Sequence, residues 1–216
     1  MCGRIGYTIS REELLRTYPW LREAPDAPAR YNVAPTDPIV VVGPCVASEV
    51  SWGLEDRKGS LFNLRAETAL KAGLYRSLLT DARVLVPASH FYEWRPSGSR
   101  RLPVAIRRRD HAPVNLAGLL GRREGAPAAT ILTTGTNPDL EPLHNRMPVV
   151  LSDDDAAAWV LEELGLEQMR EMLRPCPAGI LELRPASPLV NDVKNDGPEL
   201  LDPAALPRRY QLDLIS

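Results

Sequence analysis

The pattern of apolar and polar positions along the chain predicts many short strands and a few helices. Apolar runs bounded by polar or turn-forming residues indicate strands at 39–42, 50–54, 83–87, 91–94, 104–107, 114–119, 130–133 and 179–183. Leu70, Leu74 and Leu78 recur at helical spacing and predict a helix at about 66–79, and a second helix is expected at about 166–173. Because the strands come in runs and do not alternate with helices, the expected fold class is α+β.

Local signals refine the positions of the helix starts and loops. Ser10 is followed three residues later by Glu13, which is the sequence of a capping box, and Pro19 should end that short helix. Ser152 precedes three aspartates, another helix start. Four prolines between residues 22 and 38 predict an ordered loop there. We find no repeat and no linker, so the chain is expected to be a single domain over 1–216, with about 203–216 as a tail.

Composition and charge exclude few classes of function. The chain has 216 residues, of which 44% are hydrophobic and 25% charged, as in ordinary globular proteins. The net charge is −2, but residues 1–150 hold 20 Lys/Arg against 15 Asp/Glu, a net +5, whereas residues 151–216 carry a net −7. Only three of the basic residues are lysines. Arginine suits phosphate binding, but it is also common in proteins from GC-rich genomes, so the charge permits a polyanionic ligand without requiring one.

Other bulk features favour a cytoplasmic protein. No apolar run is long enough for a membrane span, and no basic segment followed by an apolar one opens the chain. The three cysteines, Cys2, Cys45 and Cys176, are odd in number and widely spaced, which fits neither a disulfide scaffold nor a zinc site. We therefore expect a reducing compartment and no metal or other cofactor.

Cys2 is the residue with the most distinctive chemistry. Removal of Met1, which is expected when the second side chain is small, would place an α-amine and a thiol on one residue. The α-amine has a reference pKa of about 7.7–8.0, against about 10.4 for lysine, so it is a far better nucleophile at neutral pH. A 1,2-aminothiol condenses with an aldehyde and closes to a thiazolidine. The ordinary explanation is that a cysteine at position 2 has no catalytic role, as in most proteins that have one there.

Four polar segments elsewhere contain residues that a core does not need. They are 30–36 (Arg-Tyr-Asn-Val-Ala-Pro-Thr), 63–68 (Asn-Leu-Arg-Ala-Glu-Thr), 91–94 (Phe-Tyr-Glu-Trp) and 144–148 (His-Asn-Arg-Met-Pro). Each has an ordinary explanation: Asn63 could cap a helix, Glu67 could pair with Arg65 or Lys71, and His144 could be a satisfied loop histidine.

Glu93 is harder to explain in this way. Strand alternation would place Phe91 and Glu93 on one face and Tyr92 and Trp94 on the other. A carboxylate among aromatic rings loses hydration, which suits acid–base work but equally fits a buried ion pair.

Together these segments resemble the SOS-response-associated peptidase family, also called abasic-site processing proteins. The motifs occur in order at 2–4 (Cys-Gly-Arg), 31–36, 52–54 (Trp-Gly-Leu), 63–68, 91–94 and 144–148, and 195–198 (Asn-Asp-Gly-Pro) is also similar. The resemblance covers about residues 2–202. One departure is Leu64, which stands between Asn63 and Arg65 where the family usually has alanine. It implies a curved, mostly antiparallel, barrel-like sheet flanked by a few helices.

The resemblance also implies a function and a set of site residues. The protein would recognise abasic sites in single-stranded DNA and bond covalently to the ring-opened aldehyde, and it is expected to be a monomer that is associated with the nucleoid when bound to DNA. The catalytic residues would be Cys2, Asn63, Glu93 and His144. The residues implied for DNA binding are Gly3, Arg4, Asn32, Pro35, Trp52, Arg65, Trp94, Arg146 and Met147.

Two other functions stay open. Class II glutamine amidotransferases also begin Met-Cys-Gly and use the Cys thiolate against a glutamine amide, although their Arg-Gly and Asn-Gly segments are missing here. A non-catalytic module that binds DNA through the basic N-terminal region is the other alternative.

Overall fold

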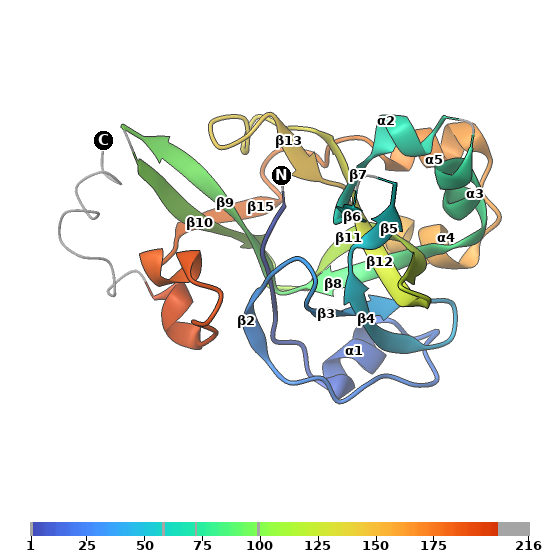
Figure 1. Ribbon diagram of the computed structural model, residues 1–216, viewed down its shortest axis with the longest axis horizontal. Helices are drawn as coiled ribbons and strands as arrows, with labels where there is room; N and C mark the ends of the chain where they lie inside the picture. The colour runs from blue at the N-terminus through green and yellow to red at the C-terminus, as the bar shows by residue number, and fades with distance from the viewer. Residues whose placement is uncertain (1, 58, 72, 99, 203–216) are drawn as a thin grey trace.

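A closed ring of five strands organises the larger sheet of the protein. The computed structural model describes residues 2–57, 59–71, 73–98 and 100–202. The ring runs through β12 (Ala126–Gly135), β4 (Ala47–Trp52), β3 (Pro38–Val42), β8 (Arg83–Ala88) and β11 (Val114–Arg123), which pairs again with β12. The β12–β4 pair is parallel and the other four are antiparallel. The expected α+β barrel-like fold is confirmed, and Figure 1 shows its helices beside the barrel.

Alternating strand residues build separate cores inside and outside the barrel. Ile39 and Val41 belong to one buried cluster, and the intervening Val40 belongs to another. The second cluster contains the buried side chains of α1 (Arg11–Thr17), α3 (Leu74–Asp81), α4 (Asp153–Leu161) and α5 (Leu166–Met172). The helices therefore cover the outer face of the barrel, and the first cluster fills its interior.

A second, five-stranded sheet lies beside the barrel. Its order is β15 (Leu181–Pro185), β10 (Arg100–Arg108), β9 (His90–Ser97), β1 (Ile5–Tyr7) and β2 (Arg30–Val33). Only Ser89 separates β8 of the barrel from β9, so the two sheets share one nearly continuous path (Figure 1). Two short 3₁₀ turns, η1 (Pro188–Asn191) and η2 (Pro198–Leu201), pack against this sheet.

The short elements add to these sheets. The strands β7 (Asn63–Arg65) and β13 (Arg146–Pro148) pair with β12, β14 (Val150–Leu151) pairs with β11, and β5 (Leu54–Asp56) forms a hairpin with β6 (Gly59–Leu61). The hairpin follows Gly53, whose φ of +123° and close approach to the Phe62 ring both exclude a side chain.

Two expectations about local structure are wrong. The helix expected at 66–79 is two helices, α2 (Ala66–Ala69) and α3, with Gly73 at φ +107° between them, because that backbone conformation interrupts a helix. The loop expected at 22–38 contains β2 and the start of β3, because pairing with β1 and β4 supplies the backbone hydrogen bonds. The predicted tail at 203–216 lies outside the described residues. No helix in the described ranges has both the length and the apolar character to cross a membrane.

Candidate active site around Cys2

Cys2 and Asn63 are joined by a hydrogen bond. The Asn63 side-chain amide donates from Nδ2 to the backbone carbonyl of Cys2 at 2.8 Å. Asn63 begins β7, which runs parallel to β12, so it is not a helix cap; α2 has Arg65 at its N-cap, without a side-chain hydrogen bond. The other amide atom of Asn63, Oδ1, is buried and has no partner in the part of the chain that the structure describes. The site thus contains an oriented amide with an acceptor still available.

The Cys2 thiol is fully buried and held in its neutral form. Its Sγ lies 4.0 Å from the carbonyl oxygen of Arg4. Burial raises the pKa of the thiol well above its ordinary range, and the negative charge of Glu93 raises it further. This thiol is therefore a poor nucleophile until a neighbouring group accepts its proton.

Glu93 lies on the expected face of β9. Phe91 belongs to the barrel-interior cluster that also contains Cys2, whereas Tyr92 and Trp94 pack in a third cluster on the other face. The alternation expected from the sequence is confirmed, and the Glu93 side chain, 4% exposed, lies on the same face as Phe91. A nearly buried carboxylate thus acts electrostatically on the thiol.

His144 lies in a turn next to the same cluster. Its Nδ1 accepts a hydrogen bond from the backbone N–H of Arg146 at 2.9 Å, so the neutral ring carries its proton on Nε2. Leu143 and Met147 on either side of it belong to the cluster of Cys2. No hydrogen bond between described residues joins His144 to Cys2 or Asn63. The structure brings Cys2, Asn63 and Glu93 together and places the His144 turn at the edge of the group.

Arg146 is bound by a carboxylate. Its two Nη atoms donate to Glu67 at 2.6 and 2.9 Å, and Nη2 also donates to the Thr133 carbonyl at 2.6 Å. This fork geometry lowers the pKa of Glu67. Glu67 thus pairs across 79 residues with Arg146 and not with Arg65 or Lys71. Arg65 itself is exposed.

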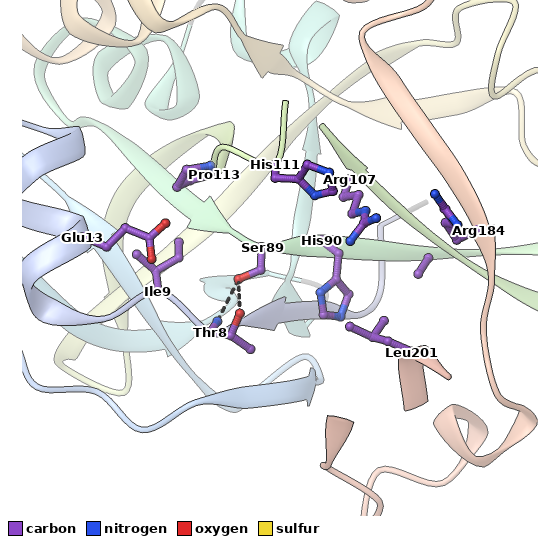
Figure 2. A pocket seen from close by; sticks show the side chains of 11 residues that line it. Thr8, Ile9, Glu13, Ser89, His90, Arg107, His111, Pro113, Arg184 and Leu201 are labelled. Carbon is purple, nitrogen blue, oxygen red and sulfur yellow. Dashed lines mark hydrogen bonds between the residues drawn. The ribbon is translucent and has the colours of Figure 1, made fainter. Parts of the chain in front are cut away.

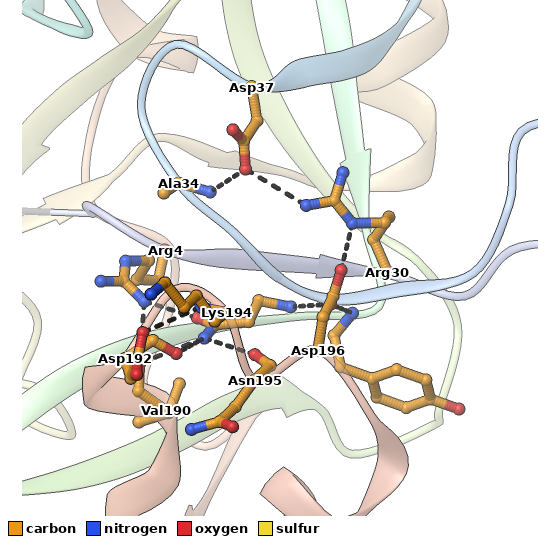
Figure 3. A network of polar contacts seen from close by, with 11 residues as sticks. Arg4, Arg30, Ala34, Asp37, Val190, Asp192, Lys194, Asn195 and Asp196 are labelled. Carbon is orange, nitrogen blue, oxygen red and sulfur yellow. Dashed lines mark hydrogen bonds and ion pairs between the residues drawn. The ribbon is translucent and has the colours of Figure 1, made fainter.

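A polar network ties the start of the chain to residues 190–196 (Figure 3). Arg4 donates from Nη1 to the side-chain oxygen of Asn32 at 2.7 Å and to the Val190 carbonyl at 2.8 Å. The buried Asn32 amide donates to the carbonyls of Val190, Asp192 and Asn195. The Asp196 carboxylate accepts from the backbone N–H groups of Tyr31 and Asn32 and from Arg30. Arg4 and Asn32 thus hold the chain in place: the Asn32 amide and Nη1 of Arg4 are both used in these internal contacts.

The remaining residues implied for DNA binding are placed differently from one another. Gly3, Pro35 and Trp94 are half-buried, and Trp94 donates from Nε1 to the Asn191 side chain at 2.8 Å. Trp52 and Met147 are fully buried in the barrel-interior cluster. The Trp52 indole donates to the Phe62 carbonyl at 2.9 Å and has no exposed face on which a base could stack. Trp52, which the resemblance implies for DNA binding, is therefore corrected to a core residue, because an indole that fills a barrel offers no surface to a base.

Sequence reasoning missed the roles of Glu67 and Asp196. Both lie within the motifs, but their partners are 79 and more than 160 residues away, and no local pattern identifies them. Among the described residues no three His, Cys, Asp or Glu side chains come together as metal ligands would.

The fold and the site define a class: small α+β proteins that bury a cysteine near the start of the chain beside an amide and a carboxylate, at the junction of a barrel and a second sheet. Residues 1–193 match the SOS response associated peptidase (SRAP) family, and the chain belongs to this family.

Relatives and solved structures agree with the assignment. The chain is 29% identical to the abasic site processing protein YedK of Escherichia coli, covering 94% of this chain and 100% of YedK. It is 30% identical to the abasic site processing protein YoqW of Bacillus subtilis, covering 94% and 99%. A crystal structure of a Bacteroides thetaiotaomicron protein superposes with a TM-score of 0.80 at 18% identity, covering 93% and 99%, which shows the same fold.

Proposed function

We propose that this protein bonds covalently to abasic sites in single-stranded DNA through the amine and thiol of Cys2. The names of its relatives support a role in abasic-site processing. The observation that carries the covalent proposal is the hydrogen bond from Asn63 to the Cys2 carbonyl, with the Glu93 charge acting on the thiol of the same residue. Core packing alone does not require an amide and a carboxylate around one cysteine.

The neutral thiol fixes the order of the two bonds. With Met1 removed, the Cys2 amine adds to the ring-opened aldehyde of the abasic sugar, and loss of one water gives an imine. The thiol then adds its sulfur to the imine carbon while its proton passes to the nitrogen, which closes the thiazolidine. Because the pKa of the thiol is raised, the amine forms the first bond and the thiol makes the product stable.

The surrounding groups have matching tasks. Asn63 orients Cys2 through its carbonyl, and its free Oδ1 can accept from the amine or the sugar. Glu93, whose charge acts on the Cys2 thiol, can move protons during imine formation, and the Nε2–H of His144 can donate to the sugar during ring opening. The exposed Arg65 is available to a flanking phosphate.

The test uses a fluorescent single-stranded oligonucleotide that carries one abasic site. Wild type should give a heat-stable shifted band on a denaturing gel, and the same oligonucleotide with a tetrahydrofuran site, which has no aldehyde, should give none. Cys2→Ser should lose the stable band but retain an imine that borohydride traps. A full crosslink with Cys2→Ala, or intact-mass spectra that show Met1 retained on the active protein, would overturn the proposal.

The same assay separates the alternatives. An amidotransferase-like enzyme would release ammonia from glutamine and leave the abasic oligonucleotide unshifted; it also needs a thiolate in the first step, which burial and Glu93 disfavour. A non-catalytic DNA-binding module would bind equally with Cys2→Ala, and its affinity would fall steeply with salt. A duplex bearing the abasic site serves as the control for single-strand preference, and light scattering tests the expected monomer.

A further inference from the structure

A cavity lies on the face of the smaller sheet that is opposite Glu93. It has a volume of about 310 Å³, which is at the lower end of the range for small-molecule sites. His90 and Tyr92 share one face of β9, and Ala105, paired with Tyr92, and Arg107 extend that face on β10. Glu93 lies on the other face, with the Cys2 site. The cavity is therefore separate from the proposed chemistry.

The cavity has opposite charges at its two ends. Figure 2 shows Glu13 at one end and Arg184 at the other, with Arg107 and His111 between them along one wall. Glu182 pairs with both Arg107, at 3.2 Å, and Arg184, so these three side chains together carry a net charge of +1. Two guanidinium groups around one carboxylate leave donors for a second anion.

His90 supplies a buried hydrogen-bond acceptor between these ends. Its imidazole is 2% exposed, and Nε2 lies 3.0 Å from the Tyr92 hydroxyl and 3.4 Å from the Tyr31 carbonyl. The Tyr92 hydroxyl donates its own proton to the Tyr31 carbonyl, so Nε2 must carry the proton of His90. Nδ1 is then an acceptor, and no other described residue bonds to it. Burial lowers the pKa of His90 to about 4, which keeps the ring neutral.

The ring is also fixed in place. A Cβ on Gly6 would lie 2.0 Å from the imidazole, so the ring lies directly against the backbone of β1. Next to it, the hydroxyls of Thr8 and Ser89 are 2.8 Å apart, and the Thr8 N–H also donates to Ser89 (Figure 2). The wall thus presents a rigid acceptor and a hydroxyl pair, which are groups suited to orienting a polar ligand.

We infer that this cavity binds a mononucleotide with an exocyclic amino group. The base amine would donate to Glu13, the sugar would meet the hydroxyl pair and His90 Nδ1, and the phosphate would lie at Arg107 and Arg184. A free amino acid offers the same pair of charges but fills less of the cavity. The site is independent of Cys2, so Cys2→Ala should bind the nucleotide as wild type does.

Titration calorimetry on the full chain tests both ends. Deoxycytidine monophosphate should bind saturably, and thymidine monophosphate, deoxycytidine and inorganic phosphate should each bind at least about tenfold more weakly. Arg184→Gln and Glu13→Gln should each weaken deoxycytidine monophosphate about tenfold, whereas Arg109→Gln and Glu12→Gln, at neighbouring positions that do not line the cavity, should not.

Thermal unfolding of each variant shows whether it is folded, so a loss of binding can be assigned to the site. The inference is overturned if millimolar deoxycytidine monophosphate gives no saturable heat, if a free amino acid binds in its place, or if the cavity and control variants bind alike. It is also overturned if Cys2→Ala abolishes binding, since that would place the nucleotide at the Cys2 site. None of these results depends on whether the abasic crosslink forms.

Discussion

Replacement of Asp196 by alanine tests whether residues 190–196 hold the N-terminal strands in place. The Asp196 carboxylate accepts hydrogen bonds from the backbone N–H groups of Tyr31 and Asn32, at 2.5 and 2.8 Å, and from the Arg30 guanidinium. Asn32 in turn binds Arg4, two residues from Cys2. Loss of the carboxylate therefore removes three contacts at one end of a chain of hydrogen bonds that reaches the site.

The loss in the free energy of unfolding can be worked out from these three contacts. The Asn32 N–H is buried, and leaving it without an acceptor costs about 1–3 kcal/mol. The half-buried Tyr31 N–H adds about 0.5–1 kcal/mol, the net value of a hydrogen bond that water can partly replace. The Arg30 and Asp196 side chains are 32% and 23% exposed, so their ion pair adds only about 0–1 kcal/mol. The free energy of unfolding should fall by about 3 kcal/mol, and the melting temperature by about 6–12 °C.

The assay is urea unfolding followed by tryptophan fluorescence, with crosslinking measured on the same samples well below the midpoint. Asp196→Asn keeps an acceptor for both N–H groups and should lose about 1 kcal/mol or less. Asp26→Ala, at an exposed position in the coil before β2, should change the free energy of unfolding by less than about 0.5 kcal/mol. Crosslinking should slow with Asp196→Ala more than with Asp196→Asn. A loss below about 1 kcal/mol for Asp196→Ala, or equal losses for both variants, would refute the reasoning.

Three further predictions concern other parts of the molecule. Glu67 occupies both Nη atoms of Arg146, so Glu67→Gln should strengthen binding of a tetrahydrofuran oligonucleotide at low salt and steepen its salt dependence, as followed by anisotropy; a weaker complex would mean that Glu67 orients Arg146 for DNA. Burial lowers the pKa of His90 to about 4, whereas the ordinary pKa of histidine in an unfolded chain is about 6.5. Below that pH the unfolded chain binds a proton that the folded chain does not, so the free energy of unfolding should fall by about 2 kcal/mol between pH 7.5 and pH 5. Urea midpoints should show this loss in wild type and not in His90→Gln, and equal pH profiles would contradict it. Gly6→Ala would place a Cβ 2.0 Å from the His90 ring, and a thermal melt should show a loss of about 3 kcal/mol; an unchanged melt would show that the ring can move aside.

Features that depend on nearby residues could be predicted from the sequence. Ser10 and Ser152 accept hydrogen bonds from the backbone N–H groups of Glu13 and Asp155, both at 3.1 Å, as the cap signals indicated. The face of β9 that carries Glu93 follows from alternation alone. In each case the physical cause lies within four residues of the signal.

Features that depend on distant partners could not be predicted. β2 forms within a proline-rich segment because β1 pairs with it, and no local pattern contains that pairing. In the sequence, Trp52 stands in a motif and nothing nearby shows whether its ring is exposed or buried. Pairing of β4 with β12 closes the barrel and buries the ring completely. The roles of Glu67 and Asp196 have the same origin, since their partners are set by topology.

The site itself is an outcome of how the two sheets meet. Asn63 belongs to β7, which is held on the barrel by parallel pairing with β12, whereas Cys2 leads into β1 and Glu93 lies on β9, both in the smaller sheet. The 2.8 Å hydrogen bond from Asn63 to Cys2 therefore crosses from one sheet to the other. Any shift between the sheets would lengthen it before disturbing either sheet. Cys2 lies before β1 and not within a strand, so this contact orients it only in the folded protein, and its geometry should be as sensitive to the contacts at the junction as to its immediate neighbours.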